Sequence, residues 1–201
     1  MSKAVLISIQ PKWCKKIVEG EKTIEVRKTR PAVYKPFKCY IYCTYGKGLI
    51  ERNDQIYPNV LLDQTVSRNK TWGNCCNGKV IGEFMCYSIE EYHADEVPFG
   101  EYDIDVDVAA AIGMTGEELW TYGKGVALYG WRISNLVIYD KTKELREFYN
   151  VCPSYGTNFG ICWGCENAVG EEFDCGVNGK IAMTKPPQSW CYVEEGQGDV
   201  L

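Results

Sequence analysis

Six stretches of the chain carry the hydrophobic pattern of β-strands. In some of them β-branched and aromatic residues run together, and in others they alternate with polar residues. In the second stretch, alternation places Ile24 and Val26 on one face and Glu25 and Arg27 on the other. The six stretches are residues 4–9, 23–27, 37–45, 79–92, 125–139 and 186–194. The pattern therefore predicts a domain built mainly from strands.

Three shorter stretches have the spacing of helices. In residues 11–18, a proline opens the segment and apolar residues recur at helical spacing, and Gly20 is placed to end it. Thr115 and Glu118 have the spacing of a capping box, which predicts a helix through about residue 122. Residues 141–149 are expected to form a third short helix. The acidic residues 94–107 are expected to form a loop.

The remaining parts of the chain show no regular period. Glycine and proline interrupt residues 46–78, and cysteines crowd residues 152–179. We expect a single domain over residues 1–195, with residues 151–180 as a Cys-rich insertion before the last strand. The order of elements predicts an α+β fold, namely a small, mostly antiparallel β-barrel flanked by short helices.

Composition limits the cellular compartments in which the protein is expected. No stretch of the 201 residues reaches the roughly 18 consecutive apolar residues of a membrane span, so no membrane partner is expected. The apolar run near the N-terminus is too short for a signal peptide. The chain contains 11 cysteines, an odd number that favours free thiols or metal ligands in a reducing compartment. A cytoplasmic location is expected.

Charge is distributed unevenly along the chain. The net charge is −5, but residues 1–38 hold ten Lys or Arg against three Glu, and residues 80–123 hold eleven acidic residues and no Lys or Arg. Because charges are screened beyond about 8–10 Å, a site responds to its local potential rather than to the total charge. The first segment can therefore present a basic face to an anionic ligand. Alternatively, its basic residues are simply solvated.

One cluster of charged residues follows the first predicted helix. Gly20 ends that helix, Lys22 lies in the turn, and Glu25 and Arg27 share a strand face, where the carboxylate can orient the cations. Arg27 offers a planar fork that suits a phosphate or a base edge, whereas Lys22 offers a point charge. The alternative is an exposed ion pair that contributes under about 1 kcal/mol.

The spacing of these residues, G-x-K-x-x-E-x-R, resembles the signature of the ASCH domain, a member of the PUA-like superfamily. The strand-to-helix sequence of residues 5–11, Arg30-Pro31 and the closing residues 186–194 are also similar to bacterial and phage ASCH proteins. The resemblance implies a PUA-like β-barrel whose signature lines a cleft, with RNA or a modified nucleotide as ligand. The resemblance also implies that Gly20, Lys22, Glu25 and Arg27, which match the signature, are cleft residues.

Tryptophans near this cleft are candidates for stacking on bases, at about 1–3 kcal/mol each. The candidates are Trp13, Trp131 and Trp190. Each could instead pack in the core, and for Trp131 we favour the core. Trp13 and Trp190 are therefore expected in the ligand site.

A hydrolase is the main alternative to a binding protein. Some small ASCH-like proteins resemble amidohydrolases of acylated cytidine, which use a lysine, a threonine nucleophile and a glutamate. Lys22 matches the lysine, but Glu25 stands where the threonine is expected, so Thr23 would have to replace it, with Glu83 as the acid. A two-histidine ribonuclease mechanism is excluded because His93 is the sole histidine. A third alternative is a protein-interaction module that uses the acidic residues 80–123.

Four cysteines of the insertion have the number of ligands that a structural zinc site needs. One C-x-x-C pair is flanked by two outlying cysteines, and a metal could supply folding energy to a segment that has little apolar core. The four residues are Cys152, Cys162, Cys165 and Cys175. The alternative is a loop of scattered, reduced thiols.

Overall fold

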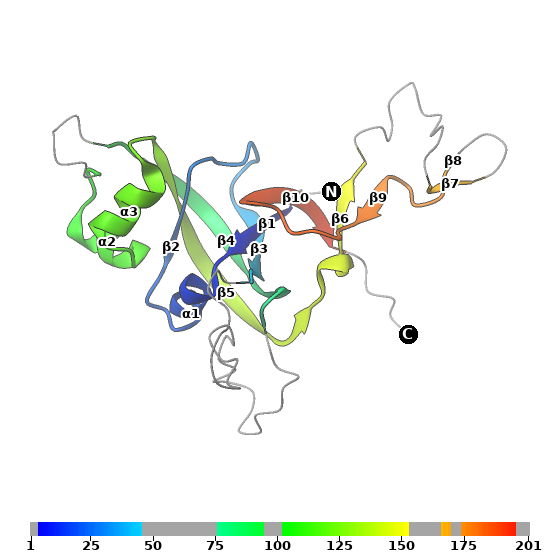
Figure 1. The fold of residues 1–201 in the computed structure, drawn as a ribbon, viewed down its shortest axis with the longest axis horizontal. Helices are drawn as coiled ribbons and strands as arrows, with labels where there is room; N and C mark the ends of the chain where they lie inside the picture. Colours follow the sequence, from blue (N-terminus) through cyan, green and yellow to red (C-terminus); the bar gives the residue numbers. More distant parts are fainter. Residues whose placement is uncertain (1–3, 46–75, 95–101, 153–165, 170–173, 196–201) are drawn as a thin grey trace.

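The main feature of the computed structural model, which describes residues 4–45, 76–94, 102–152, 166–169 and 174–195, is one eight-stranded sheet (Figure 1). The strand order is β2-β5-β4-β3-β1-β10-β6-β9. All neighbouring strands are antiparallel except β1 and β3, which run parallel. The strands are β1 (Ala4–Ile9), β2 (Ile24–Arg27), β3 (Phe37–Cys43), β4 (Lys79–Tyr92), β5 (Leu128–Lys143), β6 (Phe148–Val151), β9 (Lys180–Ala182) and β10 (Trp190–Glu195). The predicted α+β, mostly antiparallel class is confirmed.

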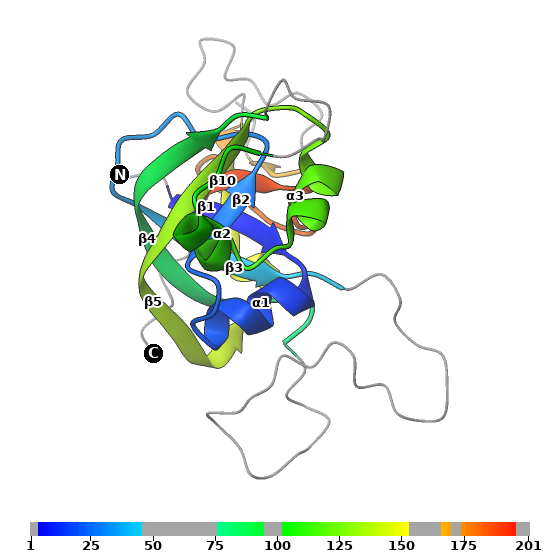
Figure 2. The ribbon, with the colours of Figure 1, turned by 90° about the vertical axis from the view of Figure 1, so that its left-hand side faces the viewer.

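The sheet curls but does not close into the predicted barrel. β4 and β5 are long and bent, and they carry β2 round toward β1 (Figure 2). The Arg27 side chain of β2 donates to the Ser8 carbonyl of β1, 2.6 Å away. β1 already pairs with β3 on one edge and with β10 on the other. No edge of β1 is left for β2, so a gap remains between these two strands.

Three α-helices accompany the sheet. They are α1 (Pro11–Val18), α2 (Val106–Ile112) and α3 (Gly116–Gly123), and one turn of 3₁₀-helix, η1, spans Leu145–Glu147. The capping box of α3 is confirmed, because Thr115 Oγ1 accepts a hydrogen bond from the Glu118 amide and Glu118 Oε2 accepts one from the Thr115 amide, both at 3.1 Å. In Figure 2, α1 and α2 lie on the side toward which β4 and β5 curve.

Two expectations about helices were wrong. Residues 141–143 continue β5, where Lys143 pairs with Val80 of β4, and residues 148–151 form β6 instead of the end of a helix. Pairing with a long neighbouring strand overrides the weak helical pattern there. Conversely, α2 begins within the acidic stretch expected to be a loop. Gly113, with φ at 67°, ends this helix in the left-handed conformation.

Apolar side chains form separate clusters on the two faces of the sheet. The inner cluster includes Ile41 and Trp131, and both are inaccessible to solvent, which confirms Trp131 as a core residue. The outer cluster includes Tyr40 and Phe148 and lies beneath η1 and β6. Because adjacent residues of β3 divide between the clusters, its alternation sets which side chains reach the interior.

The Cys-rich insertion is only partly within the described residues. Of residues 151–180, the structure describes 151–152, 166–169 and 174–180, and these include the short strands β7 (Ala168–Val169) and β8 (Asp174–Cys175), which pair antiparallel. The single-domain boundary of 1–195 stays a prediction. Among the described residues, no helix is long and apolar enough to cross a membrane.

Candidate functional site

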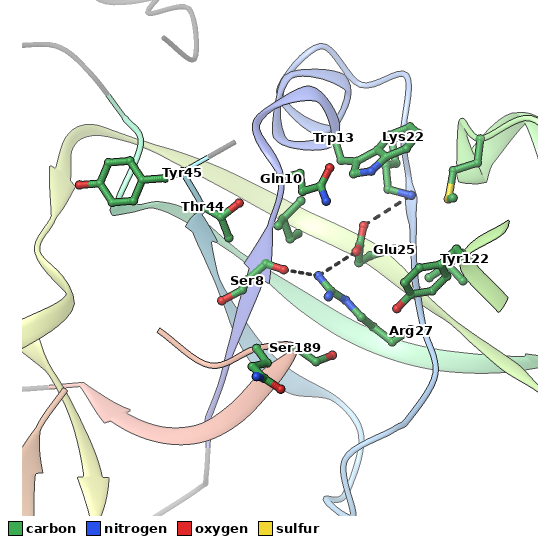
Figure 3. A pocket seen from close by; sticks show the side chains of 14 residues that line it. Ser8, Gln10, Trp13, Lys22, Glu25, Arg27, Thr44, Tyr45, Tyr122 and Ser189 are labelled. Carbon is green, nitrogen blue, oxygen red and sulfur yellow. Dashed lines mark hydrogen bonds and ion pairs between the residues drawn. The ribbon is translucent and has the colours of Figure 1, made fainter. Parts of the chain in front are cut away.

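A cavity of about 330 Å³ opens at the gap between β1 and β2 (Figure 3). Its lining comes from four regions of the chain that are far apart in sequence, within residues 8–27, 44–45, 114–122 and 188–189. The lining residues are Ser8, Ile9, Gln10, Trp13, Lys22, Glu25, Val26, Arg27, Thr44, Tyr45, Met114, Tyr122, Gln188 and Ser189. Lys22, Glu25 and Arg27, the charged residues of the sequence motif, all line this cavity.

Glu25 lies between the two cations of the motif. Its Oε1 is 3.0 Å from Arg27 Nη2 and its Oε2 is 3.4 Å from Lys22 Nζ. The side chains of all three residues are at least nine-tenths buried. Glu25 Oε2 has no hydrogen-bond partner among the described residues, although Lys22 is close. One carboxylate oxygen is therefore free to accept a hydrogen bond from a ligand.

Lys22 is held by backbone as well as by Glu25. Its Nζ donates to the carbonyl oxygens of Ile24, at 2.8 Å, and Ile112, at 2.7 Å. Burial lowers the pKa of Lys22, and the charge of Glu25 opposes this shift. The Ile112 carbonyl is at the end of α2, so Lys22 also meets the negative end of that helix. Lys22 acts mainly as a link between β2 and α2.

Arg27 is oriented by β1 and faces α3. Its Nη2 donates to the Ser8 carbonyl, at 2.6 Å, and pairs with Glu25. Its Nε is buried and has no hydrogen-bond partner in the described part of the chain. The side chain of Tyr122 lies beside the guanidinium (Figure 3). Burial raises the pKa of the Tyr122 phenol, while the positive charge of Arg27 opposes the rise.

Trp13 provides an aromatic wall surrounded by lysines. The Nζ atoms of Lys12, Lys16 and Lys22 lie 4.1, 5.4 and 5.5 Å from its ring centroid. The indole is half-buried, which leaves part of its surface facing the cavity. Such a ring can stack against a planar ligand.

The cavity is less basic than the N-terminal segment suggested. In the part of the chain that the structure describes, the charged lining residues are Lys22, Glu25 and Arg27, with a net charge of +1. Other basic residues of that segment are paired elsewhere: Lys12 with Glu118 at 2.8 Å, and Lys38 with Glu83 at 2.9 Å. The acidic part of the chain thus folds against the basic part and offsets much of its charge.

Three candidate residues do not line the cavity. Gly20, with φ at 78°, forms the turn that leads to Lys22. Thr23 is exposed, its amide donates to the Ala111 carbonyl, and its carbonyl accepts from the Ile133 amide. Trp190 packs on Trp131 at 5.9 Å between ring centroids, and its Nε1 donates to Thr29.

Several lining residues were not identified from the sequence. Ser8 and Gln10 lie at the carboxyl end of β1, and Thr44 follows the carboxyl end of β3. Carboxyl ends of adjacent parallel strands meet at one edge of a sheet, so the parallel pairing of β1 and β3 explains why these polar residues converge. Nothing in the local sequence marks Tyr122, which reaches the cavity from α3.

Glu83, suggested as an acid for hydrolysis, lies on the other face of the sheet. It is opposite Tyr40 in the β3–β4 register, accepts a hydrogen bond from Tyr139 at 2.5 Å and pairs with Lys38. These hydrogen bonds hold the pKa of Glu83 below its ordinary value although burial opposes the shift. Because Tyr40 belongs to the outer apolar cluster, Glu83 cannot act in the cavity.

The proposed zinc ligands fall largely outside the described residues. Cys162 and Cys165 are outside them, and the side chain of Cys175 is also not described. Cys152 is half-buried and free. Within the described ranges, no three His, Cys, Asp or Glu side chains are grouped closely enough to hold a metal ion.

Comparison with known proteins finds similarity in solved structures only. The chain matches no protein-family model and no curated protein sequence. It is similar to the crystal structure of ASCH from Zymomonas mobilis, with 15% identity over 96% of this chain and 88% of that one, at a TM-score of 0.48. A mutant of the same protein matches with 14% identity over 96% of this chain and 91% of that one, also at a TM-score of 0.48.

Proposed function

We propose that the cavity between β1 and β2 binds a nucleotide-type ligand, either a free modified nucleotide or a single nucleotide of an RNA. The observation that carries the proposal is the pair of unsatisfied polar atoms in Glu25 and Arg27. Oε2 of the carboxylate can accept one hydrogen bond, and Nε of the guanidinium can donate one. A nucleotide offers N–H or O–H donors and ring-nitrogen, carbonyl or phosphate acceptors that match both atoms.

Size and lining agree with one nucleotide unit. A cavity of about 330 Å³ is at the lower end of the roughly 300–1,000 Å³ that small-molecule sites occupy. The half-buried indole of Trp13 supplies a surface for a base, and Ser8, Thr44 and Gln188 add polar residues to the lining. A cavity of this size is too small to hold a nucleic-acid duplex.

The charge of the cavity argues for few phosphate contacts. A net charge of +1 in the lining favours one anionic group and does not favour an extended polyanion. For a single strand, log K falls with log salt with a slope of about −0.7 for each phosphate contacted. We therefore expect a slope near −0.7 for a short RNA, and a slope near −4 would indicate about six phosphate contacts.

Hydrolysis gains no support from the placement of the threonine. Thr23 is exposed and outside the cavity, and Glu25 occupies the position expected for a nucleophilic threonine. A nucleophile also needs an adjacent base and donors for the oxyanion. The binding function is therefore the one that the described side chains support.

Calorimetric titration with the nucleoside 5′-monophosphates, base-modified derivatives and a short single-stranded RNA tests this function. We expect at least one ligand to bind at micromolar concentrations, and Glu25→Gln to weaken it at least about tenfold, a loss of 1.4 kcal/mol. Glu19→Gln is the matched control, because Glu19 pairs with Lys15 on the surface of α1, away from the cavity. If no ligand binds, or if Glu25→Gln binds like the control, the proposal is wrong.

A further inference from the structure

The buried charges of the cavity are not balanced. Two cations, Lys22 and Arg27, share one carboxylate, Glu25, and no other acidic side chain among the described residues lines the hollow. Exposed fractions of the three side chains are 2%, 9% and 6%, respectively. A buried charge without a counter-charge is unfavourable, because solvent cannot compensate it there. The imbalance suggests that the ligand supplies the missing negative charge.

The contacts of Lys22 indicate that it is a charged ammonium. An ammonium has three N–H donors and no acceptor, whereas a neutral amine has a lone pair that should not face an oxygen. Three oxygens surround Nζ: the carbonyls of Ile24 and Ile112, at 2.8 and 2.7 Å, and the Glu25 carboxylate, at 3.4 Å. The two carbonyls take two of the donors, and the Glu25 oxygen forms an ion pair with the ammonium rather than a hydrogen bond, so Lys22 contributes mainly charge to the cavity.

Arg27 is the residue that retains capacity for an anion. Its guanidinium has five N–H donors. Among the described residues, Nη2 donates to the Ser8 carbonyl and pairs with Glu25, and the guanidinium also lies against the Tyr122 hydroxyl. Buried Nε lacks a partner among the described residues. A planar guanidinium with unused donors is the group that proteins most often use to hold phosphate or carboxylate.

We propose that the ligand enters this cavity with an anionic group on Arg27, and that the preferred ligand is a phosphorylated nucleoside rather than the nucleoside itself. This inference rests on the proposed function. Glu25 repels the anion, but its Oε1 already faces Arg27 Nη2 and its Oε2 accepts a donor from the ribose or the base. Glu25 thus selects an orientation, and the second cation leaves the site with the charge to hold the phosphate.

Competition and direct titration with three matched probes test the inference. The probes are a nucleoside 5′-monophosphate, the same nucleoside and inorganic phosphate. We expect the monophosphate to bind at least about tenfold more tightly than the nucleoside, and inorganic phosphate to compete with the monophosphate. Equal affinities for monophosphate and nucleoside overturn the inference but leave the proposed function standing. If neither binds, both are overturned.

A charge-removing substitution assigns the effect to one residue. In Arg27→Gln, the monophosphate should lose its advantage over the nucleoside, whereas Arg27→Lys should retain part of it. Arg30→Gln is the control: this exposed residue lies over the Tyr129 ring, at 5.4 Å, outside the cavity, and loses the same charge. An equal loss in Arg30→Gln and Arg27→Gln would overturn the assignment. If Arg27→Gln does not fold, two other results test the assignment to Arg27. Arg27→Lys should still bind the monophosphate more tightly than the nucleoside, and inorganic phosphate should compete with the monophosphate in the natural protein. Failure of either result overturns the assignment.

Discussion

The Nζ atom of Lys22 donates a hydrogen bond to the carbonyl oxygen of Ile112, 90 residues away along the chain, at 2.7 Å. Ile112 is the last residue of α2, and Lys16 donates in the same way to the Gly113 carbonyl, also at 2.7 Å. Two lysines therefore satisfy carbonyls at the end of α2, where helices leave them without partners. The motif that lines the cavity also fastens a helix to the sheet.

Lys22→Met should destabilise the protein and loosen α2. The variant leaves the Ile24 and Ile112 carbonyls buried without their donor, and Glu25 without one of its two ion-pair partners. Breaking a buried ion pair on one side costs about 3–5 kcal/mol. Urea denaturation measures the loss in free energy of unfolding, and faster hydrogen exchange in residues 106–112 localises it.

Lys15→Met is the matched control for this experiment. Lys15 is half exposed on α1 and lies 3.7 Å from Glu19, an arrangement that contributes about 0.3–0.5 kcal/mol. If Lys22→Met lowers stability no more than Lys15→Met, and exchange in α2 is unchanged, Lys22 is not the link we describe.

The strands were the most predictable part of the fold. Alternation in residues 79–92 matches β4 at both ends, because one of its faces is apolar over most of its length. The extension of β5 to Lys143 was not predictable from local sequence, since it depends on pairing with β4. The failure of the sheet to close into a barrel was equally unpredictable from local sequence. It follows from β1 having partners on both edges, and this is a property of the whole sheet.

The motif predicted which charged residues meet but not how strongly basic their surroundings are. Lys12 is neutralised by Glu118, 106 residues further along the chain, and no local pattern shows that pairing. Similarly, Tyr122 reaches Arg27 only because α3 packs beside β2. Charge counted along a segment overestimates the potential of a site when a distant segment of opposite charge folds against it.

Stability should fall as pH rises from 9 to 11, in part through Cys86. Burial raises the pKa of this thiol from 9.0 to about 11, and its Sγ donates to the Ser88 carbonyl at 3.3 Å. Between these values the folded state holds a proton that the unfolded state has lost, so the free energy of unfolding decreases with pH. For one group the change is about 2–3 kcal/mol, since each pKa unit corresponds to 1.36 kcal/mol.

Comparison with Cys86→Ala isolates this contribution. Other buried groups, such as Cys191, with its pKa raised to about 11, titrate in both proteins and cancel in the difference. Denaturation at several pH values should show that the variant loses less stability than the natural protein between pH 9 and 11. If the two proteins lose the same stability between pH 9 and 11, Cys86 does not contribute to the pH dependence.

The zinc site remains a proposal drawn from the spacing of Cys152, Cys162, Cys165 and Cys175. Protein purified without chelator should contain about one zinc ion per chain if four thiolates form a closed tetrahedral site. The double variant Cys162→Ser, Cys165→Ser should lose the metal, whereas Cys191→Ser on β10 should keep it. Metal analysis that finds no zinc in the natural protein, or the same content in all three, contradicts the site.

Trp13 and Trp190 were both candidates for base stacking, and the structure separates them. Trp13 lines the cavity, whereas Trp190 packs on Trp131. Because stacking contributes about 1–3 kcal/mol per base, Trp13→Ala should weaken nucleotide binding by about 5- to 150-fold in calorimetric titration. Trp190→Phe, which retains an aromatic ring against Trp131, should leave the affinity within about twofold of the natural protein, a difference of 0.4 kcal/mol. If Trp190→Phe weakens binding as strongly as Trp13→Ala, the ligand extends toward β10 and the cavity between β1 and β2 is only part of the site.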